Sequence, residues 1–251
     1  MPNAASNSPP VSKMRYWIDR AVRVAVAVAL LPAVAGSARA LAYGAALVTL
    51  PQSGRSSAFM PFFLGIVAFC ILYVAGVRPT RLYVFGHELT HAIFGFLDGA
   101  EVGKISVRKD SGSVMLSRMN TLTLLAPDFF PFYTVCLILL IGVVSIFLPL
   151  EKARIPIFAA LGVSWGFHLC FTLASLLVRQ SDVTRCGTLF GLVWILLSNL
   201  WVLGAALVVA GPLPAGEYLH MLVDETADAY RWVFAAVAHA PWARSLNAVP
   251  D

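Results

Sequence analysis

Long apolar runs separated by short polar breaks dominate the chain. Runs with the length of a bilayer span cover residues 59–77, 121–149, 156–178 and 187–211. Another apolar run follows the basic stretch KMRYWIDRAVR and extends toward Leu50. That order of basic and apolar residues is typical either of a signal peptide or of an uncleaved helix.

Two features accompany this first run. Ala38-Arg39-Ala40 has the small-residue pattern of a signal-peptidase site, whereas an uncleaved helix would be interrupted at Pro32 and Arg39. We adopt the uncleaved helix as our interpretation. Residues 1–12, rich in Pro, Ser and Asn, have the composition of a disordered segment.

The segments between the apolar runs have different patterns. Residues 83–97 have helical periodicity but are too short for a comfortable span. Residues 101–118 alternate polar and β-branched positions around Asp110-Ser111-Gly112, which predicts a β-hairpin with a short turn. From residue 216 onward, charged and apolar residues alternate with the period of an amphipathic surface helix.

These patterns predict an all-α polytopic membrane protein with about five to six transmembrane or re-entrant helices. A small β-hairpin follows the helix at 83–97. We divide the chain into a disordered, basic N-terminus (1–20), a membrane-embedded core (21–211) and an amphipathic C-terminal segment (212–251).

Composition supports a location in the lipid bilayer. Of all residues 59% are hydrophobic and only 12% are charged, whereas soluble domains have about a quarter charged residues. The net charge of +5 is spread over the breaks between apolar runs, so we expect no nucleic-acid partner. Arg78 and Arg81 mark a cytoplasmic side. We therefore expect a multi-pass protein of the cell (inner) membrane, with its polar site facing the cytoplasm.

The stretch FGHELTHAIFGFLDGA contains the candidate chemistry. His87, Glu88 and His91 form an H-E-x-x-H motif, and residues i and i+4 share one face of a helix. Two imidazoles in that arrangement can bind one zinc ion at about 2.0–2.1 Å each. Glu88 can then take a proton from a zinc-bound water and later release it.

A catalytic zinc ion usually has three protein ligands. Asp98 follows His91 by seven residues, about 10.5 Å along a helix axis, which is too far for the same ion. Asp128, at a break in an apolar run, and Asp182, where a run ends, both remain candidates. His168 lies in the middle of a run and fits a buried core histidine better than a ligand.

The order of these features resembles the site-2 protease family of intramembrane zinc metalloproteases, over about residues 59–211. H-E-x-x-H is followed by a polar hairpin, a helix opening near Ala126-Pro127, a second helix, and an aspartate at its exit. The resemblance implies that His87, His91 and Asp182 bind Zn²⁺ and that Glu88 is the general base.

The family usually has Asn-Pro-Asp-Gly or Leu-Asp-Gly around that aspartate, whereas this chain has Gln180-Ser181-Asp182 with no following glycine. Asp128 therefore stays as the alternative third ligand.

The resemblance also implies a substrate and a mode of recognition. The substrate would be a transmembrane protein cut in or near its spanning segment, and a strand of the hairpin would pair with the unwound substrate. The chain has no inserted sensing domain of the PDZ kind, so a regulatory membrane partner would supply regulation.

Two other hypotheses remain: a membrane peptidase with a glutamate as third ligand, and a non-catalytic scaffold or metal-binding protein that retains the motif.

Overall fold

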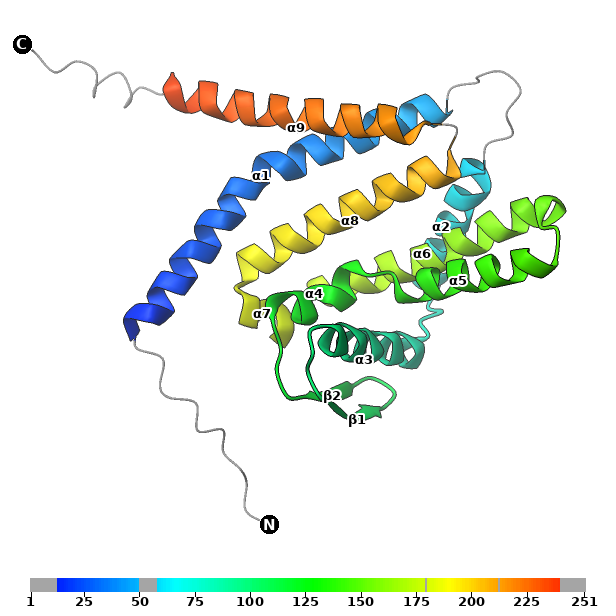
Figure 1. Ribbon diagram of the computed structural model, residues 1–251, viewed down its shortest axis with the longest axis horizontal. Coiled ribbons are helices and arrows are strands. Elements are labelled where there is room, and N and C mark those ends of the chain that lie inside the picture. The colour runs from blue at the N-terminus through cyan, green and yellow to red at the C-terminus, as the bar shows by residue number, and fades with distance from the viewer. Residues whose placement is uncertain (1–12, 50–57, 179, 212, 240–251) are drawn as a thin grey trace, which may run out of the picture.

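The computed structural model describes residues 13–49, 58–178, 180–211 and 213–239, and most of them are helical (Figure 1). The elements in chain order are α1 (Lys13–Thr49), α2 (Phe59–Val74), α3 (Thr80–Leu97), β1 (Val102–Val107), β2 (Gly112–Leu116), α4 (Thr121–Phe129), α5 (Phe132–Phe147), η1 (Glu151–Ala153), α6 (Arg154–Leu176), α7 (Ser181–Cys186), α8 (Thr188–Ala210) and α9 (Ala215–Ala238).

Three helical stretches are long and apolar enough to cross a membrane: Met14–Val48, Glu151–Leu176 and Thr188–Ala210. A fourth candidate is the pair α4 and α5, which bend by 72° at the break between them. α2 is apolar but only 16 residues long. A helical fold with three to four candidate spans, compatible with a membrane protein, is therefore confirmed for the described part of the chain.

The bend between α4 and α5 has a local cause. Phe130 is extended, with φ −94° and ψ 108°, as expected of a residue that precedes a proline, and Pro131 then caps α5. At the other end of α4 the side chain of Asn120 accepts a hydrogen bond of 2.7 Å from the N–H of Thr123. The run at 121–149 thus contains two helices, and the short helix α4 lies at 72° to α5.

Buried apolar side chains join α4, α7 and α8. Leu125 is fully buried, and it packs with Val183 and Cys186 of α7 and with Ile195 of α8. This cluster fixes the short helix α7, which the sequence patterns did not predict.

α2 packs along α6, where Gly65 lies so close to the α6 backbone that any Cβ would collide.

α1 corrects one of our sequence interpretations. Arg39 and Pro32 do not interrupt the helix, since α1 continues to Thr49. The guanidinium group of Arg39 pairs with the carboxylate of Glu225 on α9 at 2.9 Å. Within the predicted C-terminal segment (212–251), α9 packs on α1 (Figure 1), and residues 212 and 240–251 lie outside the described part.

The predicted N-terminal segment at 1–20 is divided. Residues 13–20 form the first turns of α1, and residues 1–12 lie outside the described part.

The predicted hairpin is present as two antiparallel strands. Val107 pairs with Gly112 across the turn, and the N–H of Arg108 donates to the carbonyl of Ser111 at 2.8 Å. The hairpin lies against α3 (Figure 1). It therefore covers the helix that contains the H-E-x-x-H motif.

Candidate metal centre

The two motif histidines face the same way on α3. Their ring centroids lie 4.8 Å apart, and the ring planes are nearly perpendicular at 83°. The side chain of His91 is buried and that of His87 is half-buried. One helical turn between them produces this pairing, as the spacing predicts.

The carboxylate of Asp182 meets both imidazoles. Its Oδ2 lies 3.5 Å from Nε2 of His91 and 3.8 Å from Nε2 of His87. The three candidate ligand atoms all lie within 4.8 Å of one another. Ligand atoms about 2.1 Å from a tetrahedral zinc ion would be about 3.4 Å apart. His87, His91 and Asp182 can therefore hold a metal ion with little rearrangement.

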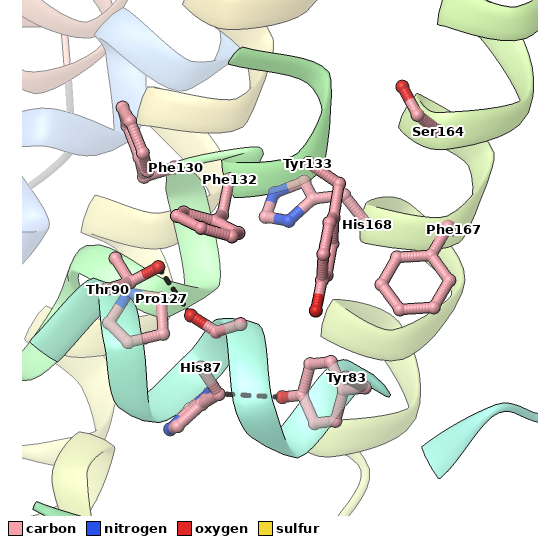
Figure 2. Close-up of a pocket in the computed structure, with 11 residues that line it drawn as sticks. Tyr83, His87, Thr90, Pro127, Phe130, Phe132, Tyr133, Ser164, Phe167 and His168 are labelled. Carbon is pink, nitrogen blue, oxygen red and sulfur yellow. Dashed lines mark hydrogen bonds between the residues drawn. The ribbon is translucent and has the colours of Figure 1, made fainter. Parts of the chain in front are cut away.

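The other ring nitrogens of the two histidines also have partners. Nδ1–H of His91 donates to the carbonyl of Thr123 at 2.8 Å. Nδ1 of His87 lies 3.3 Å from the hydroxyl oxygen of Tyr83, shown as a dashed line in Figure 2. Metal-bound histidines usually donate their second ring N–H to an oxygen in this way, which fixes the tautomer and leaves Nε2 for the metal. The donor set therefore fits a metal ion.

Glu88 is buried beneath the hairpin. A Cβ placed on Gly112 of β2 would lie 2.5 Å from Cγ and 2.6 Å from Oε1 of Glu88. Only glycine allows the strand to pass this close to the glutamate. Glu88 is thus held between the motif helix and the first residue of β2, and the residue is 8% exposed.

The environment moves the pKa values of the two carboxyl groups in opposite directions. Burial, as the largest effect, raises the pKa of Glu88 above its usual range, although the neighbouring imidazoles oppose this. Burial alone would also raise the pKa of Asp182, but hydrogen-bonding and charge interactions with His87 and His91 outweigh it and hold that pKa well below its usual range. Asp182 is therefore suited to bind a metal ion as an ionised carboxylate.

Asp128, the alternative third ligand, does not join this group. Its carboxyl is fully buried, and its Oδ1 accepts a hydrogen bond of 3.3 Å from the hydroxyl of Ser175. Asn199 donates to its main-chain carbonyl at 2.9 Å. Asp98 forms an ion pair of 3.6 Å with Arg118, which agrees with its rejection as a ligand.

His168 lies in α6, outside the cluster. It is buried and lines a cavity of about 20 Å³ next to Tyr83, His87 and Tyr133 (Figure 2). Such a volume accommodates one water molecule. Its Nε2 has no hydrogen-bond partner among the described residues. His168 is buried outside the ligand cluster, in agreement with a core histidine rather than a ligand.

Three contributors to the site escaped the sequence patterns. Tyr83 could have been found, because it precedes His87 by one helical turn. The carbonyl of Thr123 gave no signal, because any residue type has one and the contact spans 32 positions. Gly112 was assigned to the hairpin turn, but its closeness to Glu88 depends on how the hairpin packs.

No protein-family model, curated protein or solved structure matches the chain. Within the described residues, one group of three or more possible metal ligands comes together, and it contains the three residues that the sequence analysis singled out. The identity of the metal as zinc stays a prediction.

Proposed function

We propose that the protein is an intramembrane zinc metalloprotease similar to the site-2 protease family. It would hydrolyse a peptide bond in or near the transmembrane segment of another membrane protein. The main support is the convergence of His87, His91 and Asp182 at distances that suit a tetrahedral ion, with the buried Glu88 beside the first histidine.

Each side chain of the site has a role in this proposal. His87, His91 and Asp182 would hold the ion and leave a fourth position open. A bound zinc ion polarises a carbonyl group and lets a water molecule ionise near pH 7. Glu88 takes the proton of the attacking water and passes it to the leaving amine.

The hairpin is the proposed docking edge for the substrate. A transmembrane helix hides its peptide groups in hydrogen bonds, so the scissile bond must first be extended. An extended segment that pairs with the hairpin would run close to Glu88, because Gly112 touches that side chain. The hydroxyl of Thr80 donates to the carboxylate of Asp110 at 3.3 Å, which ties the hairpin turn to the start of α3.

The proposed arrangement in the membrane has five to six transmembrane or re-entrant helices. The broken pair α4–α5 and the 16-residue α2 supply the helices beyond the three longest spans. Arg78 and Arg81, together with the basic residues of the hairpin, favour a cytoplasmic position for the site. The membrane would be the cell (inner) membrane, and a membrane partner would supply regulation.

Substitution of the proposed base tests this function. The experiment expresses the wild type, Glu88→Gln and the control Glu217→Gln, each with a panel of tagged single-span proteins. Glu217 is an exposed glutamate on α9, away from the proposed docking edge. Wild type and Glu217→Gln should release the same fragment, while Glu88→Gln should cut about 10²–10⁴ times more slowly with zinc still bound. If wild type and Glu88→Gln give identical fragment patterns, the scaffold or metal-binding alternative replaces the protease.

A further inference from the structure

A second cavity lies away from the metal centre, between the first turns of α1 and the junction of α7 with α8. Its volume is about 520 Å³, and we call it the basic groove. The residues that matter for its chemistry are Asp19, Arg20, Arg23, Arg185, Leu189 and Phe190. Segments separated by more than 150 positions build it, so it is a product of the fold.

The groove carries an excess of positive charge. Three arginines line it, against a single acidic residue, Asp19. Nη1 of Arg23 donates to the carbonyl of Arg185 at 3.0 Å, which ties α1 to α7, and Arg20 lies 5.7 Å from the ring centre of Trp17. Among the described residues, no ion pair neutralises any of these three arginines. Since α8 begins at the groove, its first N–H groups and its dipole add to the attraction for an anion.

The walls of the groove suit a lipid better than a soluble anion. Leu189 and Phe190 lie beside the arginines, and a free phosphate gains nothing from apolar walls. Both α1 and α8 belong to candidate membrane spans, and the groove lies where these spans begin. Tyr16 and Trp17 are exposed at the same end, as is typical of aromatic residues at a membrane–water interface.

We propose that the basic groove binds one anionic phospholipid. Arg20 and Arg185 contact the phosphate with paired N–H groups, Arg23 holds the two walls together, and the acyl chains follow Leu189 and Phe190 into the bilayer. Basic pockets between transmembrane helices recognise anionic headgroups by the same chemistry. The lipid site shares α7 with Asp182 but needs no catalytic activity. The lipid-binding proposal is therefore independent of the proposed protease function.

Lipid binding to the purified protein in a neutral detergent tests the site. Native mass spectrometry would follow titration with phosphatidylglycerol and, separately, with phosphatidylcholine. We expect one phosphatidylglycerol to bind at least about tenfold more tightly than phosphatidylcholine, and the double variant Arg20→Gln/Arg185→Gln to lose at least about tenfold of that affinity.

The control Arg108→Gln/Arg154→Gln removes the same charge from exposed positions elsewhere and should change affinity by less than about twofold. Equal binding of the two lipids, or equal losses in the two double variants, would overturn the site. Competition by glycerol 3-phosphate distinguishes the sources: displacement of the lipid at equal concentration would mean a soluble anion site and would also overturn it.

Photocrosslinking of the wild type covers the case in which the double variant fails to fold. A photoreactive phosphatidylglycerol should label peptides from residues 14–24 and 184–190. Labelling confined to other parts of the chain contradicts the proposal.

Discussion

Replacement of Tyr83 by Phe removes one hydroxyl group next to the metal centre and little else. The hydroxyl oxygen lies 3.3 Å from Nδ1 of His87, just beyond the usual N–H···O range. The ring stacks on Phe171 with centroids 4.6 Å apart and planes 11° from parallel, and Phe preserves this stack. A neutral hydrogen bond contributes about 0.5–1.5 kcal/mol, and the long distance favours the lower part of that range. A loss of about 0.5–1 kcal/mol weakens zinc binding about two- to fivefold.

Competition with a chromogenic zinc chelator in detergent would measure the dissociation constant of zinc. Tyr73→Phe is the matched control, because the ring of Tyr73 also packs on Phe171, with centroids 5.2 Å apart, but its other ring contact is with Phe69 rather than with His87. We expect the control to bind zinc like the wild type. If Tyr83→Phe binds zinc as tightly as the wild type, or if both variants weaken it equally, Tyr83 does not orient His87.

Two further substitutions test the packing around the site. Gly112→Ala puts a Cβ against Glu88, which should lower the free energy of unfolding by about 1–3 kcal/mol and should speed amide hydrogen exchange in the hairpin. The control Gly142→Ala, where a Cβ meets open space, should leave hydrogen exchange in the hairpin unchanged. Leu125→Ala empties a fully buried position beneath α7 and should lower the free energy of unfolding by about 2–5 kcal/mol. The exposed Leu139→Ala serves as its control in thermal unfolding, and equal melting temperatures would contradict the packing described.

The predictable part of the fold is the part that local patterns encode. Apolar runs and turn residues predicted the longer helices and the hairpin, because both depend on neighbours in sequence. The continuity of α1 through Arg39 was missed, because its partner Glu225 lies 186 positions away. α7 was missed for a similar reason, since its position is fixed by packing on Leu125 and Ile195.

In the candidate site too, local contacts were predictable from the sequence and contacts between distant segments were not. The pairing of His87 with His91 follows from helix geometry and was predictable. The choice between Asp182 and Asp128 was not, because it depends on where a distant helix packs. A family resemblance favoured Asp182, and the structure brings that carboxylate to the imidazoles. The carbonyl of Thr123 could not be predicted from residue type at all.

Zinc content is the most direct test of the metal centre. Elemental analysis would compare purified wild type, Asp182→Ala and Asp128→Asn after dialysis against a weak chelator, with thermal unfolding to verify that each is folded. The three-ligand cluster at 87, 91 and 182 predicts about one zinc ion per chain in wild type and in Asp128→Asn, and almost none in Asp182→Ala. Zinc retained by Asp182→Ala, or lost only from Asp128→Asn, would contradict it.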